Sequence, residues 1–210
     1  MRLQSGEKVL FIGDSITDAG RFEDPERMGY GYVRLFRDLC WVRYPELAFE
    51  IVNRGVSGDT IRHLDARWDR DVIAVKPDVL IVSIGVNDVW RQLEKPANSE
   101  EVFLEEFTAT YRRLLSWARE TVGCRLLLCE ATIIGETRAA LHNPIVDRYN
   151  EAIAGLAEEF EAVLVPMNQA FWRVIDADPS RRWTSDGVHP LSNGHTLMAV
   201  TLFETLGGCP

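Results

Sequence analysis

The fold is decided by the stretch VLFIGDSITD, residues 9–18. Its first four residues are apolar and predict a buried strand, and the Gly-Asp pair directly after them predicts a tight turn. In open α/β sheets, ligands bind beyond the carboxyl ends of the strands. Ser15 is therefore predicted to stand where a bound ligand can reach its hydroxyl group.

Similar apolar runs recur along the chain and alternate with longer amphipathic segments. The predicted strands are residues 8–12, 49–53, 79–84, 125–131 and 162–165, and the predicted helices are residues 32–44, 60–75, 99–121, 145–159 and 192–206. Strands that are apolar almost throughout are typical of a parallel sheet covered on both faces. We therefore expect the α/β class, with right-handed crossovers and a three-layer α/β/α sandwich around a mainly five-stranded parallel sheet.

Length and composition limit the function classes. A chain of 210 residues, with 46% hydrophobic and 26% charged residues, is of the size of one globular domain over residues 1–210. The net charge of −9 argues against nucleic acid or an anionic membrane as a partner. No run approaches the ~20 apolar residues of a membrane span, and no signal-peptide pattern precedes the first strand, so we expect a cytoplasmic protein with reduced cysteines.

Three irregular segments follow predicted strands, at residues 17–31, 92–98 and 132–144. Long loops in compact domains are uncommon unless they are functional. Because each segment leaves the carboxyl end of a strand, we expect the three to wall the cleft above the sheet.

Three residues have the chemistry of a nucleophile, a base and an orienting carboxylate. Ser15 is the candidate nucleophile, with a helix N-cap as its alternative role. Asp186 and His189 lie three residues apart in DGVHP, just before the last predicted helix. At that spacing the aspartate can hold the imidazole while the imidazole takes the serine proton. A capping or core histidine is the alternative for His189.

Two further residues are candidate donors for an oxyanion hole. Gly58 occurs in NRGVSGDT, residues 53–60, and Asn87 occurs in GVND, residues 85–88, after the third predicted strand. A glycine lets the backbone approach a ligand closely, and an asparagine can point an amide N–H at a developing negative charge. With the backbone N–H of Ser15 they would complete the hole, although either can equally be a turn residue.

The candidate substrate-binding residues are Asp14, Trp90, Arg91 and Trp183. Indole faces suit sugar rings, and an arginine can donate hydrogen bonds to carbonyl or hydroxyl groups. Asp14 lies beside the nucleophile, but a carboxylate in a tight turn commonly accepts backbone N–H bonds instead. Interface or core packing is the alternative for Trp90, Arg91 and Trp183.

In chain order, Ser15, Gly58, Asn87 and His189 match the four blocks for which the SGNH hydrolases, or GDSL esterases and lipases, are named. The phrases at residues 6–18, 66–68, 87–92 and 188–190 resemble the bacterial intracellular acetylxylan esterases of that superfamily. The resemblance implies a flavodoxin-like fold and a serine esterase without metal or cofactor. It further implies an acetylated xylo-oligosaccharide as the small-molecule substrate, and assembly into a homo-oligomer.

Three other kinds of function are compatible with parts of the sequence: another esterase, a phosphoesterase or a binding protein. Within the esterases, the alternatives are a broader short-chain acylesterase, a thioesterase or a lysophospholipase, because one site geometry serves many acyl groups. A two-metal phosphoesterase would use the set Asp14, Asp59, Asn87, Asp88, Asp186 and His189, but the chain lacks an Asp-x-His pair on the first strand and the set holds a single well-placed histidine. A non-catalytic carbohydrate-binding protein is disfavoured because every catalytic residue type is present.

Overall fold

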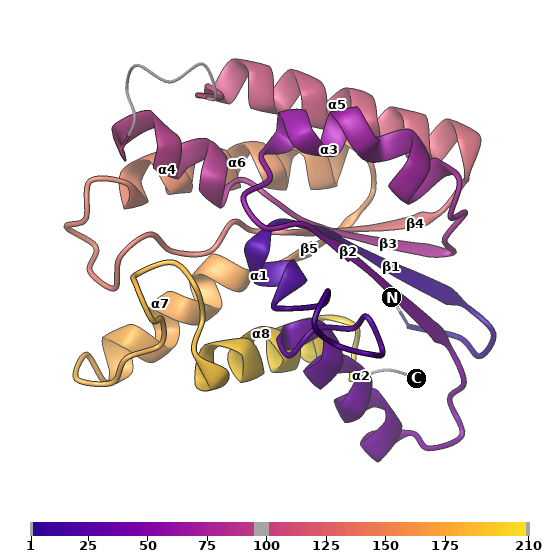
Figure 1. The fold of residues 1–210 in the computed structure, drawn as a ribbon. Coiled ribbons are helices and arrows are strands. Elements are labelled where there is room, and N and C mark those ends of the chain that lie inside the picture. Colours follow the sequence, from indigo (N-terminus) through magenta and orange to yellow (C-terminus); the bar gives the residue numbers. More distant parts are fainter. Residues whose placement is uncertain (1, 95–100, 209–210) are drawn as a thin grey trace.

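The computed structural model describes residues 2–94 and 101–208, and it is drawn in Figure 1. Five strands form one sheet: β1 (Lys8–Gly13), β2 (Glu50–Gly55), β3 (Val79–Ser83), β4 (Arg125–Cys129) and β5 (Val163–Val165). They are all parallel and lie in the order β2-β1-β3-β4-β5. The predicted five-stranded parallel sheet is therefore confirmed, and each strand begins within one residue of its predicted start.

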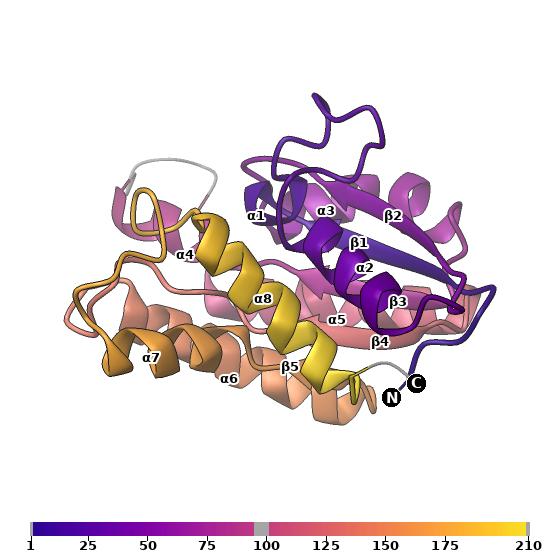
Figure 2. The same cartoon turned by 90° about the horizontal axis from the view of Figure 1, so that it is seen from below.

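Helices cover both faces of the sheet. They are α1 (Ser15–Asp18), α2 (Tyr32–Arg43), α3 (Ile61–Trp68), α4 (Val86–Glu94), α5 (Leu104–Thr121), α6 (Asn143–Glu159), α7 (Met167–Ala177) and α8 (Ser192–Thr205), with a π-helical turn at Asp69–Ile73 after α3. Figures 1 and 2 show α3, α5 and α6 on one face and α2, α7 and α8 on the other. This arrangement is the predicted three-layer sandwich.

Several helices differ from the prediction. Helices α4 and α7 were not predicted, and α4 includes residues 92–94 of a segment expected to be irregular. The rest of that segment, residues 95–98, lies outside the described residues, as do residues 99–100 of the predicted helix 99–121 and Cys209. That helix begins at Leu104. The predicted helix 60–75 is divided into α3 and the π-helical turn.

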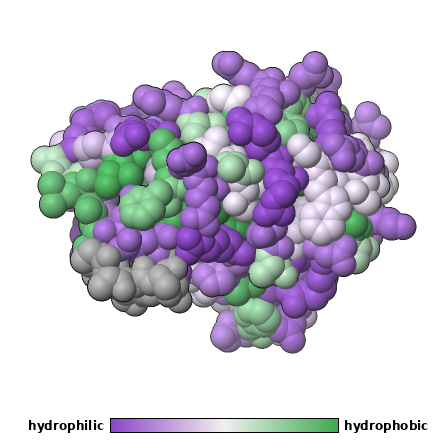
Figure 3. All heavy atoms as spheres, turned by 90° about the horizontal axis from the view of Figure 1, so that it is seen from above, coloured by the Kyte–Doolittle hydropathy of each residue, from purple (hydrophilic) through white to green (hydrophobic). Residues whose placement is uncertain are grey.

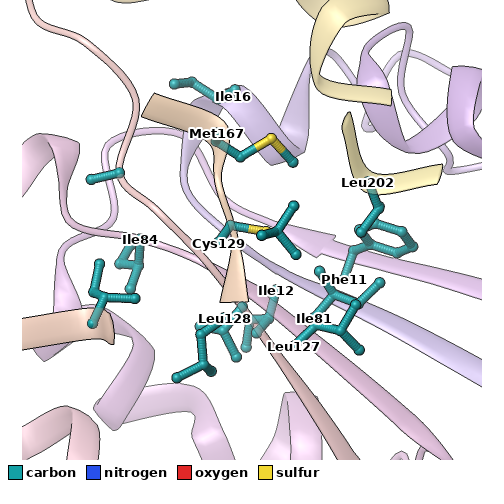
Figure 4. Packing of buried hydrophobic residues seen from close by; sticks show 14 of the residues in the cluster. Phe11, Ile12, Ile16, Ile81, Ile84, Leu127, Leu128, Cys129, Met167 and Leu202 are labelled. Carbon is teal, nitrogen blue, oxygen red and sulfur yellow. The ribbon is translucent and has the colours of Figure 1, made fainter. Parts of the chain in front are cut away.

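The core lies between the sheet and its helices. Four consecutive residues of β1, from Val9 to Ile12, are fully buried, and Figure 4 shows labelled side chains from β1, β3, β4, α7 and α8 converging there. Figure 3 shows the molecule from the side of α3 and α5, and this surface is largely hydrophilic. Within the described parts of the chain, no helix combines the length and hydropathy that crossing a membrane would take.

A buried arginine ties the carboxyl ends of β1 and β2 together. The guanidinium of Arg67 donates to the carbonyl oxygens of Gly13 at 3.1 Å and Arg54 at 2.8 Å. It also donates to the carboxylates of Asp59 at 2.7 Å and Asp71 at 2.9 Å. Because a buried ion pair leaves an uncompensated charge when one partner is removed, this contact is a strong constraint on the end of the sheet.

Replacing the guanidinium should therefore destabilise the fold. We expect Arg67→Met to lower the free energy of unfolding by about 3–5 kcal/mol, since Asp59 would stay buried without its partner and Asp71 would lose its buried partner. Arg70→Met is the matched control, because Arg70 also bonds Asp71 but its side chain is 74% exposed; its loss should cost about 0–1 kcal/mol. Urea denaturation of both variants measures the difference, and equal losses would contradict the role given to Arg67.

Candidate active site

Ser15 is the first residue of the short helix α1, directly beyond β1. The N-cap of that helix is Asp14, whose carboxylate Oδ1 accepts the backbone N–H of Ile16 at 3.0 Å. The hydroxyl of Ser15 is thus not needed as a helix cap. The preceding Gly13 has no room for a side chain, because a Cβ there would collide with the carbonyl oxygen of Ser83 on β3. This close approach sets the position of the serine above the sheet.

His189 reaches Ser15 from the loop between α7 and α8. Its Nε2 lies 2.8 Å from Ser15 Oγ, and its Nδ1 lies 2.7 Å from Asp186 Oδ2. The other oxygen of Asp186 accepts the backbone N–H groups of Val188 and His189. Partial burial raises the pKa of Asp186, but these hydrogen bonds outweigh it and lower the pKa to about 2. The carboxylate is therefore ionised and fixes which ring nitrogen faces the serine.

The segment between β2 and α3 carries Gly58. Its φ of +85° is in the left-handed region, which favours glycine. Asn87, in the first turn of α4, donates from Nδ2 to the carbonyl oxygen of Asp59 at 2.9 Å. An amide nitrogen carries two protons, so this contact orients the side chain and leaves a second N–H. Ser15, Gly58 and Asn87 thus share the lining of one cavity.

Asp88 holds the C-terminal end of the segment that carries Gly58. Its Oδ1 accepts the backbone N–H of Ile61, the first residue of α3, at 3.0 Å. Burial, helped by the nearby Asp14, raises the pKa of Asp88 to about 7, although the N–H of Ile61 opposes the shift. Burial likewise raises the pKa of Asp14 to about 7, although the N–H of Ile16 and the ring of His189 oppose the shift. Two buried carboxyl groups beside the serine are therefore partly protonated at neutral pH.

The cavity above Ser15 has a volume of about 380 Å³. It is lined by Ser15, Ser57, Gly58, Asn87, Trp90, Arg91 and His189. The sequence had singled out all of these except Ser57, which is the direct neighbour of Gly58 and hydrogen-bonds Asp18 at 2.7 Å. Asp14 and Trp183, the other two candidate substrate-binding residues, are not part of this lining, and their contact with a substrate stays a prediction.

The expectation that three loops wall the cleft was wrong for two of them, and it stays a prediction for the third, whose described side chains, at residues 92 and 93, do not line the cavity. Among the described residues, no part of the lining comes from residues 17–31 or 132–144. The first loop is instead held against β2, where Asn53 Nδ2 donates to the carbonyl oxygens of Thr17 at 2.7 Å and Met28 at 2.8 Å. Figure 1 shows α1, α4 and the gold loop before α8 at one end of the sheet; they supply the lining residues other than Ser57 and Gly58, which come from the segment between β2 and α3.

The acidic residues considered for a metal site serve other contacts. Among residues 2–94 and 101–208, no three His, Cys, Asp or Glu side chains are grouped so that they could hold a metal ion. Asp59 pairs with Arg67, and Asp186 pairs with His189. The nearby His195 accepts the backbone N–H of Tyr32 at 3.2 Å, and burial lowers its pKa to about 4. A neutral His195 therefore serves the packing of α8 against α2.

Comparisons with known proteins agree with this geometry. Residues 11–197 match the GDSL-like Lipase/Acylhydrolase family. An acetylxylan esterase of Geobacillus stearothermophilus is 39% identical over 214 residues, which cover 99% of this chain and 97% of that protein.

Solved structures give the same result for the fold. The crystal structure of Axe2, an acetylxylan esterase from Geobacillus stearothermophilus, superposes with a TM-score of 0.91 at 36% identity, covering 99% of this chain and 97% of that one. LAE5, an alpha/beta hydrolase enzyme from the metagenome of Lake Arreo, has a TM-score of 0.91 at 33% identity, with 98% and 97% covered. Further Axe2 structures are described as catalytic mutants, in which alanine replaces a serine, an aspartate or a histidine.

The raised pKa of Asp88 predicts how stability depends on pH. An unfolded aspartate has a pKa of about 3.9, so between pH 4 and 7 the folded protein holds a proton that the unfolded chain has lost, and stability falls as the pH rises. We expect Asp88→Asn to reduce that fall by about 1–3 kcal/mol between pH 5 and pH 8. Denaturation at the two pH values measures it, with the exposed Asp147→Asn as control; an unchanged difference would contradict the assignment.

Proposed function

We propose that this chain, which belongs to the GDSL-like lipase/acylhydrolase family and is a carboxylic ester hydrolase, removes acetyl groups from xylo-oligosaccharides through an acyl-enzyme on Ser15. The observation that carries the proposal is the chain of hydrogen bonds from Asp186 through His189 to the Ser15 hydroxyl, beside a cavity that Gly58 and Asn87 also line. A serine activated by a base, with donors at hand for a negative oxygen, is the arrangement that acyl transfer requires.

In the acylation step, Ser15 Oγ attacks the carbonyl carbon of the ester while His189 Nε2 takes the hydroxyl proton. The carbonyl oxygen becomes an oxyanion, which accepts hydrogen bonds from the N–H groups of Ser15 and Gly58 and from the Asn87 amide. Asp186 stabilises the imidazolium that forms. The C–O bond to the sugar then breaks, and the sugar alcohol leaves with the proton from His189.

Deacylation repeats these steps with water as the nucleophile. His189 takes a proton from the water as its oxygen attacks the acyl carbon, and the same donors hold the second oxyanion. Collapse breaks the bond to Ser15 Oγ, which recovers its proton from His189, and acetate leaves. Every step uses side chains and backbone N–H groups of this chain, so the proposal includes no metal and no organic cofactor.

The lining of the cavity supports a short acyl group and a sugar. A volume of about 380 Å³ is at the small end of the range for ligand pockets. The Trp90 ring lies edge-on to His189, with 6.4 Å between ring centroids, and is available to a sugar ring beside the reacting carbonyl. Arg91 is placed next to Gly58 by its bond to the Gly58 carbonyl oxygen at 2.5 Å. Axe2, to which this chain is similar, is described as an acetyl-xylooligosaccharide esterase.

The proposal extends to the setting of the enzyme. We place it in the cytoplasm as a single-domain protein, where it would meet imported oligosaccharides rather than polymeric xylan, and we expect it to form a homo-oligomer. These parts rest on the resemblance to intracellular acetylxylan esterases. Light scattering on the eluted peak of a size-exclusion column tests the assembly, and a mass of one chain, 23.8 kDa, would contradict it.

The substrate class follows from rates on a graded series of esters. We expect acetylated xylo-oligosaccharide and p-nitrophenyl acetate to be hydrolysed fast, with rates that fall steeply through butyrate, octanoate and palmitate, because the cavity is small. Ser15→Ala should lower kcat by about 10⁴–10⁶-fold.

The same series separates the alternatives. Rates that rise toward octanoate or palmitate while the sugar is untouched would move the assignment to a lysophospholipase or a thioesterase. An active Ser15→Ala would remove the proposed mechanism altogether.

Loss of the orienting carboxylate should affect rate more than binding. We expect Asp186→Asn to lower kcat by up to about 10⁴-fold with little change in KM, because an amide leaves His189 in the wrong tautomer. Asp176→Asn, at an exposed position of α7, is the control. Steady-state kinetics on p-nitrophenyl acetate decide; a rise in KM with kcat preserved would place Asp186 in substrate binding.

A further inference from the structure

The loop that carries Asp186 and His189 is exposed, and hydrogen bonds to the rest of the protein hold it in place. The Asp186 side chain is 47% exposed and that of His189 is 38% exposed. A reacting group displaced by about 1 Å can cost about 10²-fold in rate, so an exposed loop of this kind needs fixed supports. One support lies within the loop, where Ser185 N–H donates to the His189 carbonyl oxygen at 2.8 Å.

The second support comes from residues 134–137, which we call the support segment. They belong to the loop after β4 and lie 47 or more residues before the loop they contact. The carboxylate oxygen Oε1 of Glu136 accepts the backbone N–H groups of Trp183 at 3.0 Å and Thr184 at 2.7 Å. The same oxygen accepts the hydroxyl of Thr184 at 2.5 Å. Hydrogen bonds to a charged acceptor are the stronger kind, and three of them meet here.

Further hydrogen bonds connect Thr184 and the support segment to Gly187, the residue that follows Asp186. The Thr184 hydroxyl oxygen accepts the backbone N–H of Gly187 at 3.1 Å, which is the peptide group directly after Asp186. On the other side of the turn, the Gly187 carbonyl oxygen accepts the N–H of Gly135 at 2.7 Å. The carbonyl group of Gly187 is thus attached directly to the support segment, and its N–H is attached through Thr184.

The support segment is itself anchored in the core. The buried carboxamide of Asn143, the first residue of α6, accepts the N–H of Ile134 at 3.0 Å. It donates to the carbonyl oxygens of Gly135 at 3.1 Å and Thr137 at 2.9 Å. A rigid helix therefore fixes the support segment, and the support segment fixes the exposed loop.

We propose that Glu136 is a positioning residue for the reaction. It acts through Thr184 to hold the side chains of Asp186 and His189 in position relative to the Ser15 hydroxyl. It does not line the cavity and does not contact the reacting atoms. The inference rests on the proposed role of Ser15, His189 and Asp186. It predicts that losing the Glu136 carboxylate impairs the chemical step and leaves substrate binding nearly unchanged.

Kinetics and proton NMR together test this role. On p-nitrophenyl acetate we expect Glu136→Ala to lower kcat by about 10- to 100-fold, with KM within about twofold of wild type. Glu136→Gln, which keeps an acceptor oxygen, should recover much of the loss. The His189 Nδ1 proton, deshielded by its 2.7 Å contact with Asp186, should broaden or vanish in Glu136→Ala. Glu151→Ala, an exposed site on α6, should match wild type in every measurement.

Double-substitution data separate positioning from general stability. Thr184→Val breaks the same connection, so the combined Glu136→Ala/Thr184→Val variant should lose little more kcat than Glu136→Ala alone. If Glu136→Ala does not fold, Glu136→Gln and Thr184→Val carry the test. A wild-type kcat and an unchanged His189 signal, with Ser15→Ala inactive, overturn this inference alone; an active Ser15→Ala overturns the proposed function instead.

Discussion

The buried guanidinium of Arg67 is the contact on which the active-site end of the sheet depends. It joins the carbonyl ends of β1 and β2, and its pairing with Asp59 fixes the segment that carries Gly58. The carbonyl oxygen of Gly13 also accepts the N–H of Val56 at 3.0 Å, so the start of that segment is tied to the strand that precedes Ser15. One buried cation thus holds the proposed nucleophile, Ser15, and a proposed oxyanion donor, Gly58, in fixed positions relative to each other.

The remaining parts of the site are attached to this frame by polar contacts of two kinds. Asn87 and Asp88, in the first turn of α4, hold the Gly58 segment through buried hydrogen bonds to the backbone of Asp59 and Ile61. The loop with His189 lies at the surface and is held by the support segment, whose glutamate meets three donors. The loop after β4 therefore acts as a support behind the His189 loop, and the cavity is lined by α1, by α4, by the Gly58 segment and by His189.

The sequence was sufficient for the sheet and insufficient for several helices. Apolar runs such as Val79–Ser83 predict strands because a parallel strand buried on both faces admits little else. Helix α4 was missed because GVND contains turn-forming residues, which hid the helical spacing that follows. Ser15 and His189 were found from local motifs. Glu136 was not, because its partners lie 47 and 48 residues away and an acid in a polar loop carries no local signal.

Burial of Asp14 and Asp88 bears on the charge balance of the reaction. Asp14 precedes Ser15 and Asp88 follows Asn87 in the chain, so full ionisation of both would oppose the negative charge of the proposed oxyanion. Burial raises the pKa of each to about 7, which favours their neutral forms, and both still accept a backbone N–H. Asp186, whose pKa is about 2, supplies the negative charge where the imidazolium needs it. Asp186 is therefore ionised at neutral pH while Asp14 and Asp88 are partly protonated, because solvent and three hydrogen bonds reach the Asp186 carboxylate and the other two carboxyl groups are buried.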